Sequence, residues 1–303
     1  MLSGADPVRI GVIGKGGSGK TSASGMLMRA ARALGLDVWG LDADFNQHLA
    51  AMFAADNSAI PSLTSAKAAL VDHVIGNRSD ITSATFTKFT TPAADSGVIC
   101  LSQEDEWLCS RYHSVEPNLH LLRVGDYQAS SHATGCYHGY TAVADILLNH
   151  LEMADNQCLV IDFTAGIDPL ASPIFLKVDV LVLAVEATLK GVAVARQWAD
   201  AMQGYPVKLH LVANKVLGEE DIFWLDHELA RQLPGLALGG VLRYEPALLR
   251  LERGEALTWN DFSAINREEL TRLIEEFSPS PMQRREQQHH LRGLEQRHAL
   301  RVI

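Results

Sequence analysis

Short apolar runs alternate with longer amphipathic segments along most of the chain. Apolar runs bounded by polar or glycine residues predict buried strands, and the longer periodic segments predict helices. The run at 178–185 is almost wholly apolar, which is expected when helices cover both faces of a parallel sheet. The predicted strands are 8–13, 37–41, 120–124, 159–161, 178–185, 207–213 and 238–242. The predicted helices are 21–34, 65–75, 140–151, 189–202, 221–233 and 261–277.

This regular alternation predicts an α/β fold, with a doubly wound, mostly parallel sheet flanked by helices. We expect one domain over residues 1–277, with a surface insertion at about 55–97, where Ser, Thr, Ala and Asp are frequent. Ser278-Pro279-Ser280-Pro281 interrupts the pattern. Residues 278–303 are therefore predicted to form a basic, histidine-containing and solvated tail.

Composition narrows the class of protein. Of 303 residues, 47% are hydrophobic and 20% are charged, as in ordinary globular proteins, and four cysteines are too few for a disulfide scaffold. No apolar run is long enough to cross a bilayer, and no secretory signal pattern is seen, so a cytoplasmic location is expected. The net charge of −10 argues against a nucleic-acid partner.

A glycine-dense segment follows the first predicted strand, where residues 14–21 read GKGGSGKT. The segment matches G-x-x-x-x-G-K-[ST], and glycines there let backbone N–H groups surround phosphate oxygens at a helix N-terminus. The pattern predicts that Lys20 reaches the β- and γ-phosphates of a nucleotide and that the Thr21 hydroxyl binds Mg²⁺. The candidate nucleotide contacts here are Gly14, Gly16, Gly17, Ser18, Gly19, Lys20, Thr21 and Ser22.

Lys15 is a second lysine within this loop. With it, KGGSGKT resembles the deviant Walker A motif of the MinD/ParA/nitrogenase-iron-protein class of P-loop ATPases. The resemblance implies an ATP-sandwich homodimer, in which Lys15 contacts the phosphates held by the partner subunit. Positive charge would then be supplied where negative charge develops, as an arginine finger supplies it.

Polar residues follow three other predicted strands. Asp42 and Asp44 follow 37–41, and Asp162 follows 159–161, at the strand ends where open α/β sheets bind ligands. Asp162 is the candidate second Mg²⁺ ligand, and Gly166 is placed to sense the γ-phosphate. The class resemblance assigns Asp44 to water activation. It also assigns Asn214, after 207–213, to the adenine base; the amide offers a donor and an acceptor.

Residues 119–151 resemble the nickel-insertion accessory ATPases of carbon monoxide dehydrogenase, the CooC family, in which a Cys-x-Cys pair of each protomer binds a metal at the dimer interface. Here Cys136 stands at the first position and His138 at the second. The resemblance implies an inter-subunit site for Zn²⁺ or Ni²⁺, since thiolate and imidazole suit either ion. A loop cysteine beside a surface histidine is the alternative. Cys100, Cys109 and Cys158 lack ligand spacing and are predicted to be core or near-core residues.

The resemblance therefore implies an ATP hydrolase, with Lys15, Lys20 and Asp44 as catalytic residues, that assists insertion of a metal into an apo-metalloenzyme client. A second hypothesis is a MinD/ParA-like positioning or partition switch that contacts a membrane or polymer through the basic tail. A third is an iron–sulfur reductase. It needs two well-placed cysteines in each protomer, whereas only Cys136 lies in a suitable loop.

Overall fold

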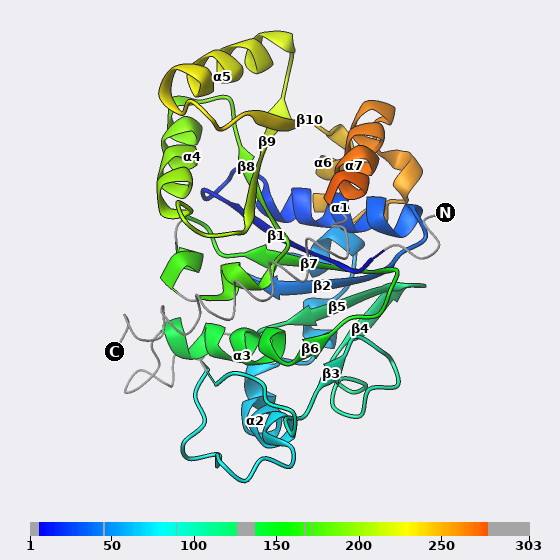
Figure 1. Cartoon of the computed structure of the whole chain (residues 1–303). Coiled ribbons are helices and arrows are strands. Elements are labelled where there is room, and N and C mark those ends of the chain that lie inside the picture. Colours follow the sequence, from blue (N-terminus) through cyan, green and yellow to red (C-terminus); the bar gives the residue numbers. More distant parts are fainter. Residues whose placement is uncertain are drawn as a thin grey trace.

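An eight-stranded sheet forms the centre of the protein (Figure 1). The computed structural model describes residues 6–44, 46–88, 90–125, 137–166, 168–171 and 173–277. The strand order is β10-β9-β8-β1-β7-β2-β5-β4, and all neighbours are parallel except the antiparallel pair β4 and β5. The strands of this sheet are β1 (Val8–Gly14), β2 (Asp37–Ala43), β4 (His113–Glu116), β5 (Leu119–Arg123), β7 (Gln157–Phe163), β8 (Val180–Val185), β9 (Lys208–Val216) and β10 (Leu238–Arg243).

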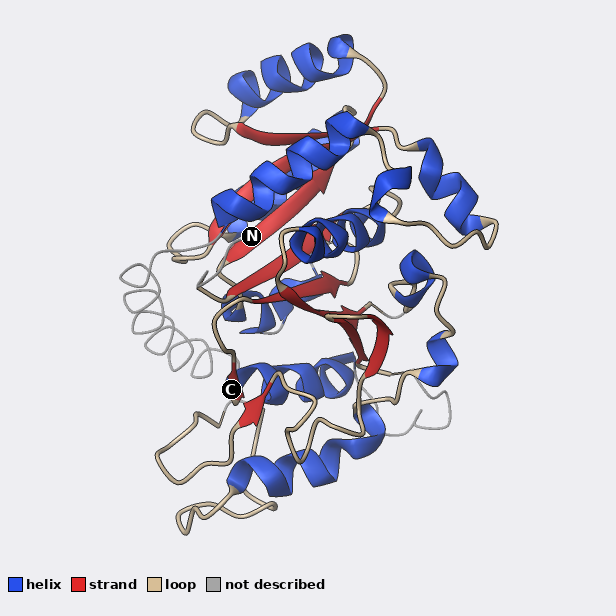
Figure 2. Cartoon of the chain, turned by 90° about the vertical axis from the view of Figure 1, so that its right-hand side faces the viewer, coloured by secondary structure: helices blue, strands red, loops and turns tan. Residues whose placement is uncertain are grey.

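Helices cover both faces of this sheet (Figure 2). The helices are α1 (Lys20–Ala33), α2 (Lys67–Ile75), α3 (Tyr137–Asn149), α4 (Leu189–Ala201), α5 (Glu219–Gln232), α6 (Pro246–Glu252) and α7 (Ala264–Phe277). One hydrophobic core lies under α1, α6 and α7, and the other lies under α2, α3, α4 and α5. A separate two-stranded sheet pairs β3 (Ile99–Cys100) with β6 (Leu151–Glu152).

Strand β8 shows why the apolar runs become central strands. Its side chains alternate between the two cores: Val180 and Val182 face α1 and α7, whereas Leu181 and Leu183 face the opposite helices. All six residues of β8 are buried. Because both faces are covered, the sequence of this strand is continuously apolar, as predicted.

The predicted fold class is confirmed, since the sheet is mostly parallel and flanked by helices. The prediction omitted β3, β4 and β6, which have two to four residues each, and α6, which has seven. Elements this short carry too little hydrophobic periodicity to be recognised, and β4 is placed by pairing with β5 rather than by its own sequence.

Two expectations on burial differ from the structure. Residues 55–97 are only in part a surface segment, because three of its own residues, Ile60, Leu63 and Leu70, are buried in the core. The prediction of three core cysteines was wrong for Cys100 and Cys109, which are exposed, and right for Cys158. Cys100 ends the two-residue strand β3 and Cys109 lies in the turn segment that follows, where an apolar neighbour does not ensure burial.

Several sequence-based predictions lie outside the described residues. These include Cys136 and the tail at 278–303; His138 lies in α3, but its side chain is not among those described. Within the ranges given above, no helix combines the length and the hydrophobicity that crossing a membrane requires.

Candidate functional site

The glycine-dense loop lies between β1 and α1, at the carboxyl ends of the central strands. Gly17 and Gly19 have φ angles of 79° and 83°, the left-handed region that favours glycine. Within the described part of the chain, the N–H groups of Gly16, Gly17 and Gly19 donate no hydrogen bond. They surround the start of α1, so the loop offers unpaired donors beside the positive end of a helix, an arrangement suited to phosphate.

Two consecutive residues of β9 hold this loop from behind. The Asn214 amide donates to the carbonyl oxygens of Ser18 at 2.8 Å and Gly19 at 3.3 Å, and the Lys215 ammonium donates to that of Gly17. A side chain at Gly19 would collide with the Asn214 amide. Because the loop carbonyls are directed to β9, its N–H groups are left for a ligand. The sequence analysis assigned the Asn214 amide to the adenine base, but in the structure its nitrogen is bonded to the loop.

Lys15 and Lys20 have different surroundings. Lys20, at the first position of α1, is 6% exposed, so its ammonium is already drawn into the site. Lys15 forms an ion pair with Glu186, which follows β8, and Glu186 also pairs with Lys215 at 3.1 Å. These two lysines lower the pKa of Glu186, although its partial burial opposes that shift. Lys15 is therefore held by its own chain in this structure.

Asp162, the penultimate residue of β7, receives two hydroxyl donors from α1. Thr21 Oγ1 donates to Asp162 Oδ2 at 2.7 Å, and Ser24 Oγ donates to Oδ1 at 3.0 Å. Asp162 is fully buried, and this burial raises its pKa to about 6. The structure therefore brings Thr21 and Asp162 into direct contact, although 141 positions separate them in the sequence.

Three carboxylates gather where β2 and β7 run side by side. Asp42 pairs with Asp162 in the register of the two strands. Burial, followed by the negative charge of Asp162, raises the pKa of Asp42 to about 8. Asp44 lies just beyond the strand, is 8% exposed, and accepts hydrogen bonds from Asn46 N at 3.0 Å and Asn46 Nδ2 at 3.3 Å. Asp44 and Asp162 thus meet at one end of the sheet.

The carboxylate and hydroxyl oxygens of this site are suitable ligands for a hard divalent cation. Mg²⁺ prefers carboxylate, hydroxyl and phosphate oxygens, and it commonly binds through one or two carboxylates plus the substrate's phosphates. Buried carboxylates that repel one another are costly when ionised, and a cation relieves that cost. The Ser18 hydroxyl, fully buried in the loop, also lacks a protein partner within the described residues. The residues present therefore fit Mg²⁺ together with a phosphorylated ligand.

Gly166, four residues after Asp162, connects this site to α4. Its N–H donates to the Gly14 carbonyl oxygen at 2.9 Å, and its own carbonyl accepts a hydrogen bond from Trp198 Nε1 at 3.1 Å. Trp198 is completely buried in α4. The segment after β7 is thus tied to the loop on one side and to a core helix on the other.

The raised pKa of Asp42 predicts a pH-dependent stability. Between about pH 4 and pH 8 the folded chain keeps a proton on Asp42 that the unfolded chain releases, so stability falls as pH rises through this range. Asp42→Asn removes this titration. In EDTA, the melting temperatures of the parent and of Asp42→Asn are compared at pH 5 and pH 8. We expect the decrease between these two pH values to be at least about 3 °C smaller in the variant. Equal losses in scanning fluorimetry would contradict this.

Sequence reasoning missed three side chains of the site. Ser24 is one helical turn after Lys20, and its hydroxyl also donates to the Lys20 carbonyl at 3.0 Å. Glu186 directly follows β8, and Lys215 is the penultimate residue of β9, as Asp162 is of β7. The only sequence signal for Glu186 and Lys215 was their position at the ends of apolar strands, and many polar residues share that position. Cys136 and the His138 side chain lie outside the description, and no group of three or more metal-binding side chains is found among the described residues.

Comparisons with known proteins agree with this geometry. Residues 12–257 match the model of the CobQ/CobB/MinD/ParA nucleotide binding domain. An uncharacterised ATP-binding protein of Methanocaldococcus jannaschii is 23% identical over 246 residues, covering 81% of this chain and 88% of the relative. The carbon monoxide dehydrogenase accessory protein CooC of Rhodospirillum rubrum is 27% identical over 221 residues, covering 72% of this chain and 79% of that protein. A ParA family ATPase of Chlorobium tepidum has a similar structure, with a TM-score of 0.61, 12% identity, and coverage of 89% and 98%.

Proposed function

Because this chain belongs to the CobQ/CobB/MinD/ParA family of P-loop ATPases, we propose that it is an ATP-dependent dimerising ATPase that assists the assembly of a metal centre in another protein. The observation that carries the ATPase part is the phosphate loop, with its unpaired N–H groups, beside Thr21 and Asp162 at 2.7 Å. The metal-centre part rests on the 27% identity to a CooC protein and on Cys136-x-His138.

In this proposal the loop N–H groups and Lys20 bind the phosphates of ATP, and Thr21 and Asp162 hold Mg²⁺. The bound Mg²⁺ would neutralise charge on the phosphates. Asp44 orients the attacking water in line with the γ-phosphate and accepts the proton that the water loses. Asn214 supports the loop through its amide nitrogen, and its amide oxygen would accept a hydrogen bond from the adenine amino group.

Lys15 would couple the nucleotide to dimerisation. In the single chain it is paired with Glu186, so it must exchange this carboxylate for the phosphates held by a partner subunit. A ligand shifts a conformational equilibrium only through a difference in affinity between the two states. The triphosphate carries one more charged group than the diphosphate, and we propose that this group draws Lys15 across the interface. Hydrolysis would then return Lys15 to Glu186.

The metal ion is cargo in this proposal, bound between subunits by Cys136 and His138. A thiolate and an imidazole from each subunit would form a four-ligand set that accepts Zn²⁺ or Ni²⁺. The client would be an apo-metalloenzyme that takes the ion when the dimer reopens.

Equilibrium dialysis of the full chain against Ni²⁺ or Zn²⁺ tests this function. With Mg²⁺ and ATP, we expect one ion per dimer. Cys136→Ser should lose the ion, whereas Cys109→Ser, which changes an exposed cysteine, should retain it. Metal binding that is unaffected by both nucleotide and Cys136→Ser would refute the metal role. ATP-dependent co-sedimentation with anionic vesicles that requires residues 282–303 would replace it with a positioning switch.

A further inference from the structure

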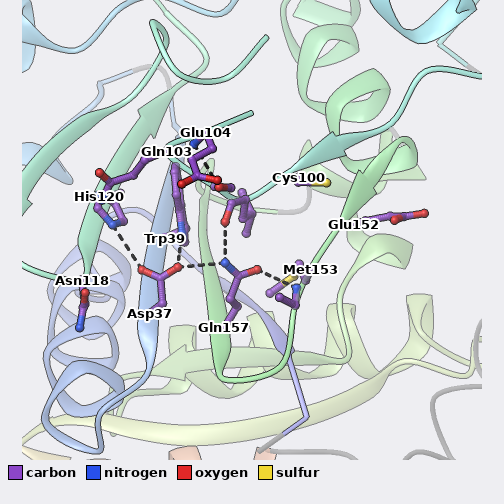
Figure 3. A pocket seen from close by; sticks show the side chains of 13 residues that line it. Asp37, Trp39, Cys100, Gln103, Glu104, Asn118, His120, Glu152, Met153 and Gln157 are labelled. Carbon is purple, nitrogen blue, oxygen red and sulfur yellow. Dashed lines mark hydrogen bonds and ion pairs between the residues drawn. The ribbon is translucent and has the colours of Figure 1, made fainter. Parts of the chain in front are cut away.

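A cavity of about 590 Å³ lies at the end of the sheet opposite the phosphate loop. It is bordered by the first residues of β2 and β7 and by Asn118, which precedes β5. Residues 100–104 and 152–154 form its other walls (Figure 3). This volume is within the range of about 300–1,000 Å³ that small-molecule sites occupy. The ATPase chemistry proposed above uses none of these residues.

The floor of the cavity is built around the carboxylate of Asp37. Asp37 Oδ2 accepts hydrogen bonds from Trp39 Nε1 at 3.0 Å and Gln157 Nε2 at 2.9 Å, and His120 Nε2 lies 3.3 Å from Oδ1 (Figure 3). The other ring nitrogen of His120 bonds to Ser114 Oγ at 2.7 Å. These contacts connect β2, β4, β5 and β7, so the floor is pre-organised rather than mobile.

The rim carries negative charge without counter-ions. Glu104 and Glu152 are exposed, lie on separate segments, and form no ion pair with any described residue (Figure 3). Among the described residues, no Lys or Arg side chain lines the cavity. Arg9 Nε donates to Met153 Sδ at 3.4 Å, and Arg9 Nη2 donates to the Leu151 carbonyl oxygen at 2.7 Å, so this guanidinium is already engaged.

This lining excludes two classes of ligand. Anions such as nucleotides and phosphates would meet Asp37, Glu104 and Glu152, with no lysine or arginine of the described lining to balance them. A metal ion is disfavoured because both oxygens of the Asp37 carboxylate already have partners in Trp39, Gln157 and His120. Leu101, Met153 and Ala154 add apolar wall, which suits an aliphatic stem.

We propose that this cavity binds a small organic cation, in which an ammonium or guanidinium group is carried on an aliphatic chain. The cationic group bonds to a rim carboxylate, that of Glu104 or that of Glu152, as charge-assisted hydrogen bonds favour. The amides of Gln103 and Asn118 serve as further acceptors, and the stem lies against Met153. The site is separate from the nucleotide site and does not depend on the proposed function.

Calorimetric titration of the full chain with agmatine tests the site directly. We expect saturable binding that weakens at least about tenfold in the double variant Glu104→Gln/Glu152→Gln, because neither rim side chain can then form a charge-assisted hydrogen bond. Glu106→Gln, an exposed acid two residues from Glu104 and outside the cavity, is the matched control and should bind like the parent. Glutarate, a dianion of similar length, should give no binding heat.

Cys100 supplies a second readout, because it lines the cavity and is exposed. Agmatine should slow alkylation of Cys100 by iodoacetamide at least about threefold, while Cys109, exposed elsewhere, reacts at an unchanged rate. Lys20→Ala should leave agmatine binding intact, which separates this site from the nucleotide site. Equal agmatine affinity in the parent and the double variant, or equal affinity for glutarate, would overturn the proposal.

Discussion

Replacing Lys15 with alanine is expected to lower ATP hydrolysis by about a hundredfold or more and to abolish the ATP-induced dimer. A positive charge supplied across an interface stabilises the transition state of phosphoryl transfer, and alanine cannot supply it. Binding of ADP should change little, because Lys20 and the loop N–H groups remain. Phosphate release measures hydrolysis, and light scattering with ATP and with ADP measures dimerisation. Hydrolysis at the parent rate by a monomeric Lys15→Ala protein would contradict the role of Lys15.

Two further variants separate the role of Lys15 from a general loss of charge. Lys190→Ala removes an exposed lysine of α4 and should leave hydrolysis and dimerisation unchanged. Glu186→Gln weakens the ion pair that holds Lys15 in its own chain. We expect this variant to dimerise at a lower ATP concentration than the parent, by about two- to fivefold, since ion pairs that remain partly exposed to solvent are worth about 0–1 kcal/mol. A higher requirement for ATP would show that Glu186 supports the dimer instead.

Replacing Asp162 with asparagine is expected to lower Mg²⁺-dependent hydrolysis by about a hundredfold or more, because charge stabilisation by a metal is worth several kcal/mol. The fold should survive, since an amide oxygen can still accept one of the two hydroxyl bonds from Thr21 and Ser24. Removing a buried charge with a raised pKa should also leave the melting temperature in EDTA no lower than that of the parent at neutral pH. Hydrolysis rates across a Mg²⁺ titration measure the first effect, and scanning fluorimetry measures the second.

A pair of substitutions at Thr21 checks the same site with less change of charge. Thr21→Ser keeps the hydroxyl and should retain most of the activity, whereas Thr21→Val has a similar shape without the hydroxyl and should lose it. Asp226→Asn, an exposed acid of α5, controls for a general effect of charge. If Thr21→Val and Asp162→Asn both hydrolyse ATP like the parent at every Mg²⁺ concentration, the proposed metal-binding pair is wrong.

Particular residues show how far the sequence alone leads. Strand β8 and helix α1 were recognisable because hydrophobic periodicity is a local property of successive residues. The phosphate loop was recognisable because its donors and Lys20 are consecutive in the chain. By contrast, β4 and α6 were missed, and Cys100 and Cys109 were wrongly assigned to the core. For these short segments, packing against distant elements outweighs local composition.

The sequence by itself determined the α/β class and the identity of the loop, since both follow from the order and spacing of neighbouring residues. Only the tertiary structure decided which residues surround that loop. The pairs Lys15–Glu186, Thr21–Asp162 and Ser18–Asn214 join positions 141 to 196 residues apart, and they form because parallel strands end at one edge of the sheet. The cavity around Asp37 is decided in the same way at the opposite edge, where the beginnings of β2 and β7 meet the segment after β3.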